Sequence, residues 1–108
     1  ESNPSSVADA RHNLASQGQV FGSGVERWSP TPFGTVIADP ARRGLAKDCV
    51  AVIDGTGASH LVLVSCDPAS LGRDAGLLAQ TGWEHQHAEV IDMFPDTSRI
   101  EVVSTFVR

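Results

Sequence analysis

Apolar residues recur along the chain in short blocks that alternate between helical and extended spacing. The helical blocks cover residues 4–17, 45–53 and 67–82. Asn3 precedes the first block as an N-cap, and Pro4 occupies the first helical position, where proline is favoured. A glycine closes or follows each block, as expected near a helix C-terminus: Gly18, Gly55 and Gly82. The pattern therefore predicts three helices.

The other apolar blocks have the spacing of strands. Residues 35–38 and 60–65 are continuous apolar runs, typical of strands buried on both faces. Two longer runs, 84–93 and 100–107, close the chain, and the six residues between them are too few for a helical crossover. We therefore expect these two to pair antiparallel. Residues 20–25 form a weaker candidate strand, which glycines interrupt.

Strands that alternate with helices are typical of an α/β fold. We expect a mostly parallel sheet with an antiparallel strand at its C-terminal edge. A length of 108 residues suits one domain. No apolar run approaches the ~20 residues of a membrane span, and the start of the chain lacks the apolar stretch of a signal peptide. Together with only two cysteines, these features predict reduced thiols and a cytoplasmic protein without membrane contact.

The charge balance restricts the possible partners. Lys and Arg number 8 and Asp and Glu number 13, so the formal net charge is −5. A chain this acidic does not hold a polyanion by bulk electrostatics. Any contact with nucleic acid must therefore be local or come from another part of a longer protein.

Candidate chemistry falls at the ends of the predicted strands. Asp39 directly follows one parallel strand and Cys66 directly follows the next, and ligands of parallel sheets bind outside these carboxyl ends. The final strand runs the other way, so its start near Glu101 lies on the same edge. The sequence thus predicts one rim that carries a nucleophile and two carboxylates.

Cys66 precedes a predicted helix, whose free N–H groups and dipole favour a thiolate. The dipole contributes only about 0.3–1 kcal/mol, and the adjacent Asp67 opposes it. We expect Cys66 to rest mainly as a thiol and to lose its proton as it attacks. The alternative is that Cys66 is a small buried residue at a strand end. Cys49 fits such a core role better, because it lies on the apolar stripe of a helix.

Two other motifs give weaker evidence of function. The spacing from Cys66 to Arg73 is one residue too long for a cysteine phosphatase loop. His85 and His87 alternate on a strand near Glu89, but no second cluster completes a set of metal ligands, so no metal site is predicted.

Three ordered motifs carry a family resemblance. They are Asp-Pro-Ala-Arg-Arg-Gly at 39–44, Val-Ser-Cys-Asp-Pro-Ala-Ser-Leu-Gly-Arg-Asp at 64–74, and Asp-Met-Phe-Pro-Asp-Thr-Ser-Arg-Ile-Glu at 92–101. They resemble the C-terminal catalytic segment of the S-adenosyl-L-methionine (SAM)-dependent uracil-5 RNA methyltransferases, which make 5-methyluridine in tRNA and 23S rRNA. The resemblance extends over essentially the whole chain.

The resemblance implies a role for each matching residue. Cys66 would add to carbon 6 of uracil, and Glu101 would then remove the proton from carbon 5. Asp39 would orient the uracil edge and contact the cofactor, and Arg42 of the same motif would bind substrate. Glu1 resembles the acidic strand end that binds the SAM ribose. The implied cofactor is SAM, and the implied partner is tRNA or rRNA.

The resemblance also implies a partial fold. Residues 1–108 would be the C-terminal part of a Rossmann-like class I methyltransferase domain that lacks the first strands of the complete sheet. The start at Glu1 and the single methionine, Met93, also suggest a fragment or a processed chain. We expect the isolated segment to be inactive, not to bind SAM productively, and to self-associate through exposed strand edges.

Three positions depart from the family motifs. Asp67 stands where the family has asparagine, Arg99 replaces a histidine, and Asp96 replaces a histidine or glutamine. A methyltransferase for a different base or for a small molecule therefore remains an alternative. So does a non-catalytic α/β interaction domain that keeps the motifs only as scaffold.

Overall fold

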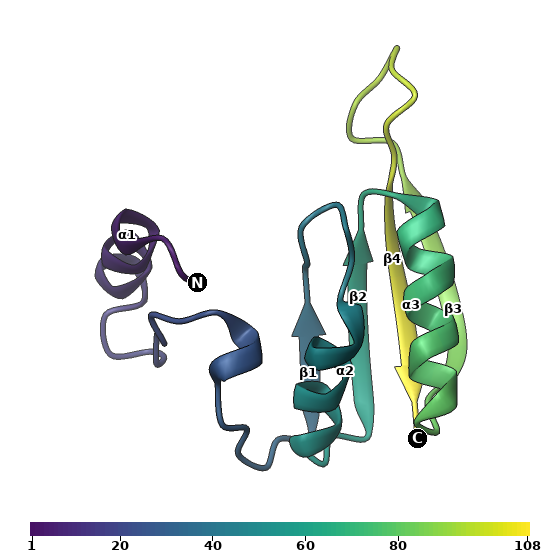
Figure 1. Cartoon of the computed structure of the whole chain (residues 1–108). Coiled ribbons are helices and arrows are strands. Elements are labelled where there is room, and N and C mark those ends of the chain that lie inside the picture. Colours follow the sequence, from purple (N-terminus) through teal and green to yellow (C-terminus); the bar gives the residue numbers. More distant parts are fainter.

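Four strands and three α-helices form an α/β fold in the computed structural model, which describes residues 1–108 (Figure 1). The strands are β1 (Thr35–Ala38), β2 (His60–Ser65), β3 (Glu84–Ile91) and β4 (Glu101–Val107). The helices are α1 (Pro4–Leu14), α2 (Ala46–Gly55) and α3 (Pro68–Gln80), with a short 3-10 helix, η1 (Val25–Arg27). None of the helices is both long enough and apolar enough to cross a membrane.

The sheet has the order β1-β2-β4-β3. β1 and β2 are parallel, and β4 runs antiparallel to both β2 and β3. The α/β class and the antiparallel pairing of the last two strands are therefore confirmed. The predicted position of the antiparallel strand is wrong, because β4 lies inside the sheet and β3 forms the edge. The side chains explain this order: the apolar residues of β4 are buried or half-buried inside the sheet, whereas β3 is mainly polar and is exposed along its whole length.

The N-terminal segment differs from the sequence prediction at two places. Asn3 caps α1 as expected, accepting a hydrogen bond from Ser5 N at 3.0 Å. The helix ends at Leu14 rather than at residue 17, because Ala15 takes a positive φ of 46°. Residues 20–25 do not form the predicted strand. This glycine-containing stretch has no neighbouring strand to pair with, and it leads into η1, which packs against α2.

Helices α2 and α3 lie on one face of the sheet (Figure 1). The core between this face and the helices consists of nine buried residues: Leu45, Val50, Ile53, Ala58, Leu61, Leu63, Leu78, Trp83 and Phe106. On the opposite face, alternate residues of β2 and β4 are only half-buried. The helix α1 lies apart from the sheet, at the other side of Figure 1.

Candidate active site

The carboxyl ends of β1 and β2 and the start of β4 lie at the same edge of the sheet, as the chain direction of each strand requires (Figure 1). Cys66 follows β2, Glu101 begins β4, and Arg42 lies in the β1–α2 loop, residues 39–45. These three line one pocket of about 230 Å³ together with Phe94 and Arg99. We call it the Cys66 pocket. The structure thus brings a thiol, a carboxylate and a guanidinium together from distant parts of the chain.

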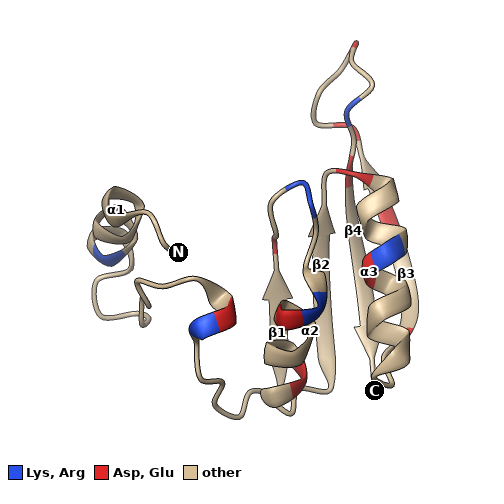
Figure 2. Ribbon diagram, viewed as in Figure 1, with Lys and Arg blue, Asp and Glu red and all other residues tan.

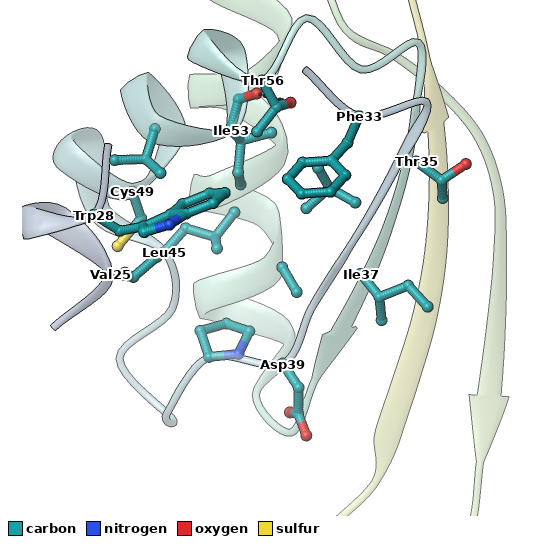
Figure 3. Close-up of a pocket in the computed structure, with 14 residues that line it drawn as sticks. Val25, Trp28, Phe33, Thr35, Ile37, Asp39, Leu45, Cys49, Ile53 and Thr56 are labelled. Atoms are coloured by element: carbon teal, nitrogen blue, oxygen red, sulfur yellow. Dashed lines mark hydrogen bonds between the residues drawn. The ribbon is translucent and has the colours of Figure 1, made fainter. Parts of the chain in front are cut away.

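Asp39 lies at the same edge but lines a different pocket. This pocket has a volume of about 460 Å³ and a mainly apolar lining, and it lies between η1, β1 and α2. Trp28 and Phe33 line it with stacked rings whose centroids are 6.1 Å apart, and Asp39 lies at one end (Figure 3). Pro40 connects the two regions, because it also lines a narrow crevice beside Cys66.

Glu1 lies in the N-terminal segment and lines neither pocket. Its carboxylate oxygen Oε1 accepts hydrogen bonds from Ser2 N and Asn3 N, each at 2.7 Å. The bonds from Asn3 and then Ser2 lower the pKa of Glu1 and keep it ionised. Of the predicted site residues, the structure therefore groups Cys66, Glu101 and Arg42, with Asp39 beside them and Glu1 in a separate segment.

The turn after Cys66 is set by the start of α3. Asp67 caps the helix with extended backbone angles, and its Oδ2 accepts a hydrogen bond from Ser70 N at 3.0 Å. The hydroxyl oxygen of Ser70 lies 2.8 Å from the same Oδ2. These bonds, that of the hydroxyl first, lower the pKa of Asp67. The charge next to Cys66 is therefore bound by the first turn of α3.

The β1–α2 loop, which carries Arg42, is tied to α3 along its length. The hydroxyl of Ser70 lies 2.8 Å from the carbonyl oxygen of Arg42, and Arg73 donates a hydrogen bond to the carbonyl oxygen of Arg43. Asp74 is fully buried, and its Oδ2 accepts a hydrogen bond from Leu45 N at 2.8 Å. Because three α3 side chains hold this loop, the backbone beneath Arg42 is fixed before any ligand binds.

The β3–β4 loop, residues 92–100, supplies the two lining residues that sequence reasoning missed as site residues. A turn holds this loop, in which Thr97 Oγ1 donates a hydrogen bond to the carbonyl oxygen of Phe94 at 2.7 Å. Thr97 Oγ1 in turn accepts a hydrogen bond from Arg99 N at 3.2 Å. Phe94 and Arg99 both belong to the third motif, at 92–101, and this was the only indication in the sequence that they could be site residues. Their shared pocket depends on how the loop folds back, which residue spacing does not reveal.

The second cysteine has a different environment. Cys49 lies on α2 and lines the apolar pocket. Burial raises the pKa of the Cys49 thiol, and Glu26 adds to the effect. This placement agrees with the core role expected from the sequence. The structure holds no group of three or more His, Cys, Asp or Glu side chains that could bind a metal ion.

The chain is similar to RNA methyltransferases in sequence and in fold. The 23S rRNA (uracil(1939)-C(5))-methyltransferase RlmD of Pseudomonas aeruginosa is 40% identical over 79 residues, which are 73% of this chain and 17% of that protein. The enzyme of the same name from Psychromonas ingrahamii is 40% identical over 81 residues, 75% of this chain and 18% of its own length. A crystal structure of Pyrococcus abyssi tRNA (uracil-54, C5)-methyltransferase with S-adenosyl-L-homocysteine matches 99% of this chain with 30% identity and a TM-score of 0.82.

The resemblance to the RNA uracil-C5 methyltransferases is confirmed. The chain spans less than a fifth of the curated relatives, and 27% of the Pyrococcus methyltransferase. A structure from Thermoplasma acidophilum, 11% identical with a TM-score of 0.69, shares the fold over 100% of this chain and 55% of its own. No family model matches the sequence.

Proposed function

We propose that this chain is the C-terminal catalytic segment of a SAM-dependent methyltransferase that modifies carbon 5 of uridine in tRNA or rRNA through a covalent cysteine adduct. The observation that supports this most is the Cys66 pocket, in which a thiol and the carboxylate of Glu101 face one space of about 230 Å³. The similarity to uracil-C5 methyltransferases of 23S rRNA and of tRNA supports the same reaction.

Cys66 is the nucleophile in this proposal. The thiol releases its proton to solvent water, and the sulfur forms a bond to carbon 6 of the uracil ring. The π electron pair of the C5=C6 double bond shifts onto carbon 5 and the C4 carbonyl oxygen as an enolate, so carbon 5 becomes nucleophilic. This addition replaces one difficult step by two easier ones, since the uracil ring alone is a weak nucleophile at carbon 5. Cys66 suits this role because it is only half-buried and lines the pocket.

Glu101 completes the reaction. When bound, SAM supplies the electrophilic methyl group that carbon 5 accepts. The carboxylate of Glu101 then takes the proton from carbon 5. The electron pair of that C–H bond re-forms the C5=C6 double bond, the bond between sulfur and carbon 6 breaks, and its electron pair returns to Cys66. A positioned base of this kind contributes about 10²–10⁴-fold to a rate.

The binding roles fall to Arg42, Asp39 and Glu1. Arg42 lies in the Cys66 pocket, where its guanidinium can bind the substrate. Asp39 and Glu1 are exposed carboxylates and therefore hydrogen-bond acceptors. Acceptors of this type fit the ribose hydroxyls and the ammonium group of SAM. Asp39, which follows β1 at the same sheet edge as Cys66, would also orient the uracil edge. RNA is the expected substrate, whether the target uridine lies in tRNA or in rRNA.

The test is methyl transfer by the full-length enzyme that contains this segment. The assay measures incorporation of tritiated methyl groups into tRNA and 23S rRNA transcripts. Cys66→Ala should abolish incorporation, because no adduct can form. Glu101→Gln should form the adduct but not resolve it, so an enzyme–RNA complex should survive denaturing electrophoresis.

Cys49→Ala is the matched control, because it removes a thiol that lies outside the Cys66 pocket. This variant should keep its activity. Full activity of Cys66→Ala would refute the covalent mechanism. Methylation of small molecules but not of either RNA would support the alternative substrate class instead.

A further inference from the structure

The structure separates the arginines into paired and unpaired groups. Three form ion pairs at nitrogen–oxygen distances of 3.8, 3.6 and 2.8 Å: Arg27 with Glu26, Arg73 with Asp74, and Arg108 with Asp54. The other four form none: Arg11, Arg42, Arg43 and Arg99. Of these, only Arg42 and Arg99 line the Cys66 pocket, and both are exposed. Figure 2 shows basic residues in the β1–α2 and β3–β4 loops, at the same end of the sheet.

Glu101 does not neutralise these two guanidiniums. It lines the same pocket, yet no ion pair joins it to Arg42 or Arg99. The pocket therefore combines two guanidiniums that form no ion pair with one carboxylate, in a chain of net charge −5. Asp67 in the adjoining crevice is a second acidic group whose charge acts on Arg42. Because the chain as a whole repels polyanions, a local pair of cations at the reaction centre needs an explanation.

Both arginines stand on fixed backbone. The carbonyl oxygen of Arg42 lies 2.8 Å from the hydroxyl of Ser70 on α3. The backbone N–H of Arg99 donates a hydrogen bond to Thr97 Oγ1 at 3.2 Å, and the Thr97 hydroxyl donates one to the carbonyl oxygen of Phe94. The two guanidiniums thus come from different loops, each held by its own hydrogen bonds. Such preorganisation reduces the cost of ordering the side chains when a ligand binds.

We propose that Arg99 acts with Arg42 to bind one phosphate of the RNA backbone beside the target uridine. This inference rests on the proposed function. A guanidinium fits a phosphate bidentately and stays charged at every physiological pH. The ring of Phe94, 40% exposed in the same pocket, offers a face for an unstacked base. Arg99 is thereby a substrate-binding residue, at a position where the family motif has a titratable histidine.

The experiment measures equilibrium binding of a target RNA stem-loop to the full-length enzyme in a Cys66→Ala background, where no methyl transfer occurs. Arg99→Ala should weaken binding about tenfold and reduce the slope of log K against log salt concentration by about one. Arg99→Lys should recover part of the affinity. Arg99→His should bind well at about pH 6 and more weakly at about pH 8, because imidazole loses its charge over this range.

Arg43→Ala is the matched control, because Arg43 is an exposed neighbour of Arg42 that does not line the pocket. Its affinity and salt slope should stay unchanged. In a second arm, a neutral methylphosphonate replaces each linkage flanking the target uridine in turn. One replacement should weaken binding to the parent protein but not to Arg99→Ala.

Equal affinity and slope for the parent and Arg99→Ala would overturn the inference, as would the same loss in Arg43→Ala. Absence of RNA binding by the parent itself would overturn the proposed function as well. The two failures are therefore distinguishable.

Discussion

Asp67 shows how one side chain can depart from a motif and still keep its structural role. Asparagine and aspartate are both favoured N-cap residues, so a change between them preserves the start of α3. Here the carboxylate accepts a hydrogen bond from Ser70 N, and the hydroxyl of Ser70 lies 2.8 Å from it. The negative charge next to Cys66 is therefore compensated locally by the helix N-terminus.

Acidification should destabilise the native chain more than an Asp67→Asn variant. Because Ser70 lowers the pKa of Asp67, the folded chain binds this proton less readily than the unfolded chain. The stabilisation is complete above the unfolded pKa of about 3.9 and is lost as the pH falls through the lower folded value. Thermal unfolding from about pH 5 to about pH 2 should show the melting temperatures of the native chain and of Asp67→Asn converging.

Asp96→Asn is the control, because the Asp96 carboxylate accepts no hydrogen bond, and its melting temperature should follow the pH dependence of the native chain. A pH-independent difference in melting temperature between the native chain and Asp67→Asn would contradict the role of the Asp67 carboxylate.

At the scale of single residues, the sequence predicted the rim better than the pockets. Strand direction alone placed Cys66 and Glu101 at one edge, and the structure brings them into one pocket. The same rule put Asp39 on that edge but could not show that Asp39 lines the apolar pocket between η1, β1 and α2 instead. Arg99 was noticed only as a departure from the motif, because its position depends on the turn built by Thr97.

At the scale of elements, the β1–α2 loop depends on a close approach to α3. Gly44 has a φ of 82°, and a Cβ atom there would collide with Asp74 Oδ2. Gly44→Ala should lower the free energy of unfolding by about 1–3 kcal/mol from backbone strain alone, with a further loss from the collision. Urea denaturation of the chain measures the change.

Gly57→Ala separates these two contributions. Gly57 also has a positive φ, 66°, but no atom lies within 4 Å of a Cβ built there. The loss in this variant should therefore be limited to backbone strain and be smaller than in Gly44→Ala. Equal losses would mean that the contact between Gly44 and Asp74 does not restrict the loop.

Periodicity predicted most elements because their apolar residues repeat at the spacing of the structure they form. It did not predict the interior position of β4. A connection of six residues requires β3 and β4 to pair, but it does not say which edge of β4 remains for β2. It predicted α3 but gave no indication that Ser70 and Asp74 would be buried beside Leu78. These polar residues are buried because they bind the β1–α2 loop, a tertiary contact that no helical pattern contains.

At the scale of the whole molecule, the fold is open along β1. This strand pairs with β2 on one side only. Ile37 is 74% exposed, and Phe33 just before the strand is 50% exposed. The Cα radius of gyration is 14.6 Å, larger than the ~13 Å of a compact domain of this size. An unpaired strand edge next to apolar side chains is a template for association.

We therefore expect the isolated chain to self-associate through β1. Light scattering coupled to size-exclusion chromatography should give at least about twice the chain mass of 11.4 kDa. Ile37→Lys should shift the chain towards monomer, because a charge at an open edge opposes pairing with a second copy. His87→Lys places the same charge on β3, the polar opposite edge, and should leave the mass unchanged. A monomeric native chain, or equal effects of the two substitutions, would show that the open β1 edge does not drive association.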